Sequence, residues 1–123
     1  MLIQYTTHQV EPDITVAEFA GHLTLGNRLL EIEHAIKEKV LNDCHKLVLD
    51  VTKLSFIDSA GIGMLVLLIG TVQRAGGKVH LAIADGKVKN VVQLVRLDHL
   101  VALYPDEAAA CAAFAQTAAA PPA

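Results

Sequence analysis

Residues 46–83 read KLVLDVTKLSFIDSAGIGMLVLLIGTVQRAGGKVHLAI, in which two short apolar runs flank a longer apolar segment. The first run, residues 46–51, is continuous, which is typical of a parallel strand covered on both faces. Residues 60–74 space their apolar side chains as a helix does, and Gly76-Gly77 predicts the end of that helix. Residues 78–83 alternate as a strand does, so the succession predicts a strand–helix–strand crossover, a connection that is almost always right-handed. We expect the helix to bury one face, formed by Ile62, Leu65, Val66, Ile69 and Val72.

The segments on either side extend this pattern to an α/β layer domain. Residues 2–8 and 14–20 are expected to form two strands joined by the turn Glu11-Pro12-Asp13. From Asn27, a candidate helix cap, apolar residues recur at intervals of three and four, which predicts an amphipathic helix. After residue 83 we expect a helix over 88–95, a short strand over 101–104, and a last helix that opens near Pro105-Asp106-Glu107. The predicted order is β-β-α-β-α-β-α-β-α, a mixed sheet with helices packed against it.

The 123 residues fit one domain, which we expect to span 1–117, followed by a flexible Ala/Pro tail over 118–123. Hydrophobic residues make up 53% of the chain, yet the longest nearly apolar stretch, 60–72, is shorter than the ~20 residues that a spanning helix needs. The first residues lack the basic start and apolar middle of a secretory signal. We therefore expect a cytoplasmic protein without membrane insertion.

Charge, cysteine and histidine usage argue against several function classes. The chain has 10 Lys and Arg against 13 Asp and Glu and no basic run, which argues against nucleic acid as a partner. Cys44 and Cys111 are isolated, so they indicate small apolar positions and no disulfide or zinc framework. The six His are scattered, with no His-x-x-x-His and no acid–His pair on a shared helix face, so we expect no metal, no cofactor and no catalytic residue.

Ser59 lies at the turn between the apolar strand and the apolar helix, where the positive end of the helix dipole accommodates negative charge. Three interpretations are open. As a helix cap, Ser59 would accept one backbone N–H. As a nucleophile it would need a base and an oxyanion site, but no Gly-x-Ser-x-Gly or Ser-His-Asp pattern is present. As a phosphoacceptor it needs only an exposed hydroxyl, and a phosphate would place about −1.5 to −2 charges beside Asp58.

The segment Asp58-Ser59-Ala60-Gly61-Ile62-Gly63 resembles the signature of the STAS domain family, and most closely that of single-domain bacterial anti-sigma factor antagonists. The resemblance extends to Phe19-Ala-Gly21-His-Leu-Thr24 before the first helix, and to Leu97-Asp98 and residues 101–104 near the end. It implies a STAS-like fold for nearly the whole chain, and it favours the interpretation of Ser59 as a phosphoacceptor.

The resemblance also implies a mechanism. In this family the unphosphorylated domain binds an anti-sigma factor that is a serine kinase, and this binding frees a sigma factor for transcription. The kinase phosphorylates the Ser that matches Ser59, which ends the association, and a phosphatase of the PP2C type reverses the step. Two alternatives remain: a cytoplasmic STAS accessory subunit of a lipid ABC transporter, and a scaffold component of a stress-signalling assembly.

The six signature residues, 58–63, are therefore the expected partner-binding loop. Asp58 either orients the loop or only caps a turn, and Gly61 and Gly63 either allow close backbone approach or are simply small. The family often has Ser or Thr after the phosphoacceptor, whereas this chain has Ala60, so only Ser59 and Ser55 carry hydroxyls nearby. We expect Ser55, like Gly21, to lie in a turn. The valines at 88, 91, 92 and 95 form either core or part of a partner-facing groove.

Overall fold

The computed structural model describes residues 3–10, 13–26, 28–43 and 45–119. Its five strands form one mixed sheet in the order β1-β2-β3-β4-β5. The first pair, β1 (Gln4–Val10) and β2 (Ile14–Leu23), is antiparallel. The remaining strands, β3 (Lys46–Ile57), β4 (Lys78–Ala82) and β5 (Ala102–Tyr104), continue the sheet in parallel. The predicted mixed sheet is confirmed.

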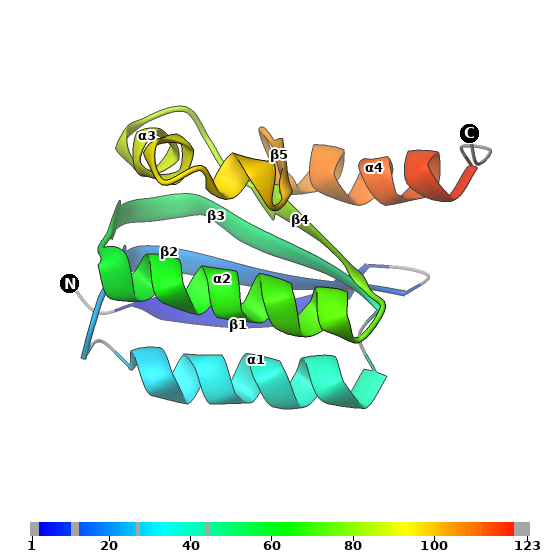
Figure 1. Cartoon of the computed structure of the whole chain (residues 1–123), viewed down its shortest axis with the longest axis horizontal. Helices are drawn as coiled ribbons and strands as arrows, with labels where there is room; N and C mark the ends of the chain where they lie inside the picture. Colours follow the sequence, from blue (N-terminus) through cyan, green and yellow to red (C-terminus); the bar gives the residue numbers. More distant parts are fainter. Residues whose placement is uncertain (1–2, 11–12, 27, 44, 120–123) are drawn as a thin grey trace.

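Four helices and one short 3-10 helix connect and cover the strands. They are α1 (Leu29–Asp43), α2 (Ser59–Arg74), α3 (Lys87–Leu94), η1 (Leu97–His99) and α4 (Glu107–Ala119). Figure 1 shows α1 and α2 on one side of the sheet and α4 on the other. The predicted order of strands and helices is confirmed. None of the helices in the described ranges is long and apolar enough to cross a membrane.

Two apolar clusters hold these layers together. The larger one joins α1, α2, α3 and η1 to one face of the sheet, and its fully buried members include Phe19, Leu49 and Leu65. The smaller one joins α4 to the opposite face through Val16, Val48 and Phe114. Such double coverage explains why the first half of β3, residues 46–51, reads as a continuous apolar run.

The strand β3 is longer than predicted, because it extends beyond residue 51 to Ile57. Its second half pairs with the end of β2, and the register between the two strands shifts between Glu18 and Ala20 and again between Gly21 and His22. The prediction that Gly21 and Ser55 lie in turns is therefore wrong. Gly21, with φ of 97°, occupies the second irregularity, and the Ser55 hydroxyl donates a hydrogen bond to the Gly21 carbonyl at 3.2 Å.

The buried face of α2 is shifted from the predicted one: Leu65, Ile69 and Val72 are buried as expected, but Ile62 and Val66 are not. Its buried residues are Gly61, Met64, Leu65, Leu68, Ile69 and Val72, whereas Ile62 is half-buried and Val66 is 40% exposed. Nearly every position from Ala60 to Ile69 is apolar or Gly, so the sequence pattern does not determine which side faces the sheet. The helix ends at Arg74, and Gly76 follows in the turn with φ of 86°, as the expected stop signal; Gly77 N–H then donates to the Val72 carbonyl at 2.9 Å.

Helix α4 packs on the sheet through His80. The His80 ring stacks on Phe114 with centroids 3.8 Å apart, and His80 Nδ1 lies 2.8 Å from the Ala110 carbonyl, to which it donates. Burial lowers the pKa of His80 below its usual value, because it disfavours the charged imidazolium. Of the expected tail, residues 118 and 119 belong to α4, and residues 120–123 lie outside the described residues, as does the expected Asn27 cap.

Candidate functional site

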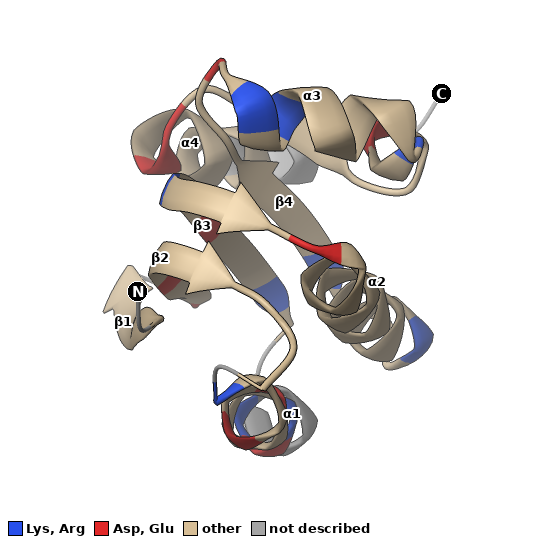
Figure 2. Cartoon of the chain, turned by 90° about the vertical axis from the view of Figure 1, so that its left-hand side faces the viewer, with Lys and Arg blue, Asp and Glu red and all other residues tan. Residues whose placement is uncertain are grey.

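The signature residues 58–63 lie where β3 ends and α2 begins. Figure 2 views the molecule from this end, at which β2 and β3 finish and α1 and α2 start. Parallel strands bring their carboxyl ends to one edge of a sheet, and the loops there are open to ligands and partners. The six residues divide into two groups according to whether they face the protein interior or the solvent.

Asp58 caps α2 and ties it to the neighbouring loop. Its backbone is extended (φ −107°, ψ −176°), and its carboxylate accepts the Gly61 N–H at 2.9 Å and the Leu25 N–H at 3.0 Å. Its own N–H donates to the Leu23 carbonyl at 3.3 Å. The N–H groups of Leu25 and Gly61 lower the pKa of Asp58 below its usual value, because they stabilise the charged carboxylate. Asp58 therefore joins the β2–α1 loop to α2, and its charge stays fixed at the site.

Ser59 is the first residue of α2, and its side chain is exposed. Because the Asp58 carboxylate fills the capping position, the interpretation of Ser59 as the helix cap is wrong. Among the described residues, no hydrogen bond joins its hydroxyl to a His, a carboxylate or any other group. The arrangement thus gives Ser59 no partner that would make it a nucleophile, and it leaves the hydroxyl accessible beside a carboxylate.

The two signature glycines have different surroundings. A Cβ on buried Gly61 would lie 2.3 Å from the Leu23 carbonyl oxygen and 2.8 Å from Ile57 Cγ1, so only glycine lets α2 approach the end of β2 this closely. A Cβ on exposed Gly63 would meet nothing within 4 Å. Ala60 and Ile62 are half-buried and pack against the larger cluster. The loop therefore presents Ser59 and Gly63 to solvent and anchors itself with the other four residues.

Exposed aliphatic and aromatic side chains are found on the neighbouring elements. Leu25 and Leu30 are 76% and 77% exposed, and they line an apolar hollow of about 290 Å³ at the start of α1. Phe56, two residues before Asp58, is 52% exposed and borders a second hollow between β3 and α3, which is also lined by Val88 and Val91. Leu25, which donates to Asp58, and Phe56 thus place exposed apolar side chains next to the signature segment.

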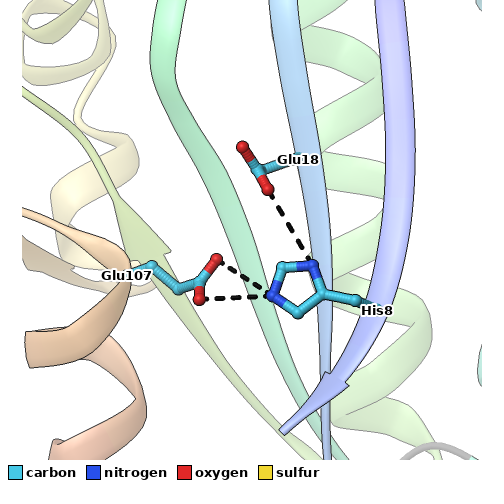
Figure 3. Close-up of side chains that lie close together, drawn as sticks. All are labelled: His8, Glu18 and Glu107. Atoms are coloured by element: carbon cyan, nitrogen blue, oxygen red, sulfur yellow. Dashed lines mark hydrogen bonds and ion pairs between the residues drawn. The ribbon is translucent and has the colours of Figure 1, made fainter.

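A second group of polar side chains joins β1, β2 and α4. Figure 3 shows the His8 ring between Glu18 and Glu107: its Nε2 lies 3.2 Å from both carboxylate oxygens of Glu107, and its Nδ1 lies 3.8 Å from Glu18. Their ligand atoms all lie within 4.8 Å of one another, so the three residues could hold a metal ion. Glu18 is also paired with Lys53 at 3.1 Å. Sequence spacing could not have found this group, because 99 residues separate His8 from Glu107.

The expectation that no acid–His pair shares a helix face is wrong. His34 and Glu38 form an acid–His pair on the exposed face of α1, with Nε2 and Oε1 3.4 Å apart. They are four residues apart, which is the spacing that places two side chains on one helix face. The pair is 76% and 68% exposed, so it is a surface contact that contributes little to stability.

The STAS domain family model matches residues 5–110, which include every strand except the first residue of β1 and all of the candidate site. The chain belongs to the STAS domain family. A comparison with curated proteins gives no significant match. The family assignment therefore rests on the matched residues, and the comparisons of structure add the likeness of the fold.

Several solved structures share this STAS fold. An anti-sigma factor antagonist from Mycobacterium paratuberculosis superposes with a TM-score of 0.81 at 21% identity, over 90% of this chain and 92% of its own. The anti-sigma factor antagonist SpoIIAA, in its unphosphorylated form, gives 0.75 at 18% identity, over 97% of this chain and 100% of its own. SpoIIAA from Bacillus in the phosphorylated form gives 0.69 at 18% identity, over 93% and 99%.

The fold also occurs in transporters. The STAS domain of a SulP transporter from Vibrio cholerae gives a TM-score of 0.69 at 18% identity, over 91% of this chain and 89% of its own. At these identities the likeness establishes a common fold and not a common partner. What this STAS domain does must therefore be argued from its own site.

Proposed function

We propose that this STAS domain is an anti-sigma factor antagonist: its unphosphorylated form binds an anti-sigma factor serine kinase and thereby frees a sigma factor. Phosphorylation of Ser59 ends the association, and a PP2C-type phosphatase restores it. The observation that carries the proposal is the exposed and unpartnered Ser59 hydroxyl at the start of α2, next to the fixed carboxylate of Asp58. Likeness to an antagonist that has both unphosphorylated and phosphorylated forms supports it.

The chemical step is a phosphoryl transfer to the domain, which binds and is modified but catalyses nothing itself. The Ser59 Oγ forms a bond to the γ-phosphorus of ATP, the bond to the β-phosphate oxygen breaks, ADP leaves, and the hydroxyl proton passes to a base of the kinase. The phosphatase transfers the phosphoryl group to water and regenerates the hydroxyl. Ser59 is accessible to both enzymes because nothing in the described part of the chain covers it.

The physical basis of the switch is the charge that the step adds. A phosphate brings about −1.5 to −2 charges to a position adjacent to a carboxylate that is already ionised. Inside an interface, juxtaposed like charges and desolvated anions cost several kcal/mol, which is at least a hundredfold in affinity. In the free domain the same phosphate stays in water at the positive end of α2, so it does not unfold the domain.

The test measures binding to the anti-sigma factor serine kinase, identified by mass spectrometry of proteins retained from native lysate by a Ser59→Ala bait and then purified. By calorimetry we expect Ser59→Ala to bind like the unmodified domain, and Ser59→Asp to bind at least tenfold more weakly. Incubation with the kinase and ATP should add phosphate to the wild type and not to Ser59→Ala. Ser55→Ala is the matched control, because Ser55 is the other hydroxyl near the loop and should leave phosphorylation unchanged.

Two results would contradict the proposal. One is equal binding of the kinase by Ser59→Asp and Ser59→Ala. The other is incorporation of phosphate at Ser55, or at any residue other than Ser59. Unfolding curves of the Ser59 variants should match that of the wild type within about 1 kcal/mol, as expected for an exposed helix position.

A second candidate function is that of an accessory STAS subunit of a membrane transporter. The STAS domain of a SulP transporter shares the fold, so STAS domains also occur in membrane transporters. Genes beside the chain's own gene distinguish the two: a small ATPase-fold kinase and a sigma factor support the antagonist, whereas a permease and its ATPase support the transporter subunit. Under the transporter hypothesis, Ser59→Asp would leave binding to the ATPase component unchanged.

A further inference from the structure

Gly63 is a glycine for which the fold provides no reason. It lies inside α2 with ordinary helical geometry, it is exposed, and a Cβ there would meet no atom within 4 Å. Two glycines nearby have structural roles: Gly61 avoids the Leu23 carbonyl oxygen, and Gly76 follows the end of α2 with φ of 86°. Glycine in an exposed helix interior is less stable than alanine, so at this position the fold alone would favour a side chain.

The position of Gly63 relative to Ser59 is fixed by helix geometry. Four residues separate them, which places Gly63 about 6 Å further along α2 on the same face. A phosphate on Ser59 can block a partner only if the partner covers Ser59. A standard interface buries about 800 Å² on each protein, a patch about 16 Å in radius, so a partner centred on Ser59 also covers Gly63.

The same helix face is free of charge. The exposed positions of α2 from its start to the third turn are Ser59, Gly63 and Val66, and no Lys, Arg, Asp or Glu occurs between Asp58 and Arg74. A surface helix ordinarily carries charged residues on its solvent side. Because this face carries no charged residue and Gly63 has no side chain, another protein can approach the α2 backbone closely without desolvating a charged group.

We propose that Gly63 determines how closely the kinase docks, with an apolar segment of the partner resting directly on the α2 backbone at this residue. The inference rests on the proposed function, because it takes the anti-sigma factor serine kinase as the occupant of the Ser59 surface. Gly63 is a positioning residue: a side chain here holds the partner away from Ser59, which reduces both affinity and transfer of phosphate to Ser59.

The chain offers a matched control on the same helix. Gly70 is eleven residues from Ser59, about 16 Å along the axis and within about 20° of the same face, which puts it at the rim of the covered patch. A Cβ at Gly70 would meet only the flexible end of the Arg74 side chain, with Nη1 2.9 Å away. Glycine is thus replaceable at both positions as far as the fold is concerned, but Gly63 lies well within a patch centred on Ser59 and Gly70 lies at its edge.

The experiment compares Gly63→Leu and Gly70→Leu in the full chain, with the purified kinase from the Ser59 test as the probe. We expect Gly63→Leu to weaken binding at least tenfold, as an overpacked contact does, with Gly70→Leu within about threefold of wild type. Gly63→Ala, which adds one carbon, should fall between wild type and Gly63→Leu. The rate of phosphate transfer to Ser59 should fall in the same order, and thermal unfolding should show Gly63→Leu no less stable than wild type.

Each outcome bears on one of the two proposals. If Ser59→Asp weakens binding but Gly63→Leu binds like wild type, the inference about Gly63 is wrong and the proposed switch stands. If both leucine variants weaken binding equally, the partner does not rest specifically on Gly63, and the inference is again wrong. If Gly63→Leu alone loses binding while Ser59→Asp binds normally, Gly63 has the assigned role and the phosphorylation switch fails. If no serine kinase binds the wild type, both proposals fail.

Discussion

Replacing Gly61 with Ala should destabilise the domain, although alanine is the better helix former. The new Cβ would lie 2.3 Å from the Leu23 carbonyl oxygen, a backbone atom that also accepts the Asp58 N–H and cannot rotate away. Overpacking costs about 1–3 kcal/mol, and a 2.3 Å approach to a backbone atom belongs to the upper end of that range, about 2–3 kcal/mol, whereas the helix preference for Ala over Gly returns about 1 kcal/mol. The expected net loss is about 1–2 kcal/mol in the free energy of unfolding, or roughly 4–8 °C in Tm.

The control is Gly63→Ala, two residues along the same helix. Its Cβ meets nothing, so only the helix preference acts, and the variant should gain about 0.5–1 kcal/mol. Urea unfolding at pH 7, followed by circular dichroism, measures both changes, and the two variants should differ by about 2–3 kcal/mol with opposite signs relative to wild type. A Gly61→Ala variant as stable as wild type would refute the reasoning, because it would mean that α2 does not need glycine to approach Leu23.

Two further predictions concern titratable residues. Asp58→Ala removes the cap of α2 and should lower the free energy of unfolding by about 1 kcal/mol at pH 7. Hydrogen bonding lowers the pKa of Asp58, so the stabilisation by its carboxylate is present above the usual pKa of 3.8 and is lost as the pH falls through the lower pKa of the folded state. In urea titrations, the free energies of unfolding of the wild type and the variant should therefore converge in acid. Burial lowers the pKa of His80, so below about pH 6.5 the unfolded chain binds a proton that the folded chain does not bind. The free energy of unfolding therefore decreases as the pH is lowered. His80→Phe should reduce the stability loss between pH 7 and pH 5, measured by urea unfolding, and an unchanged loss would show that His80 is not its source.

The order of elements could be predicted because each depends on local sequence. Apolar spacing, Gly76-Gly77 and the continuous run at 46–51 lie within single elements, and all of them recur in the structure. The length of β3 and the buried face of α2 could not be predicted, since both depend on contacts between elements. The end of β3 pairs with β2 across two register shifts, and an all-apolar helix such as α2 takes its orientation from the surface on which it packs.

The candidate site was predictable as a segment but not as an arrangement. The sequence shows Asp58 and Ser59 side by side and leaves open which of them caps the helix. The structure assigns the cap to Asp58 through the N–H groups of Gly61 and Leu25, and Leu25 is 33 residues away in the chain. The different roles of Gly61 and Gly63 are likewise invisible in the sequence, because only the neighbouring β2 carbonyl distinguishes them.

The separation of cap and hydroxyl has a consequence for the proposed switch. If one side chain both capped α2 and received phosphate, modification would break the cap and lower stability by about 1 kcal/mol, so the fold would change with the signal. Here Asp58 holds α2 and the Leu25 loop, while Ser59 makes no contact that its modification would break within the described part of the chain. Phosphorylation then changes the charge of the surface without changing the fold beneath it. The proposed switch then acts on the partner through the added charge and not through a change in the fold of this domain.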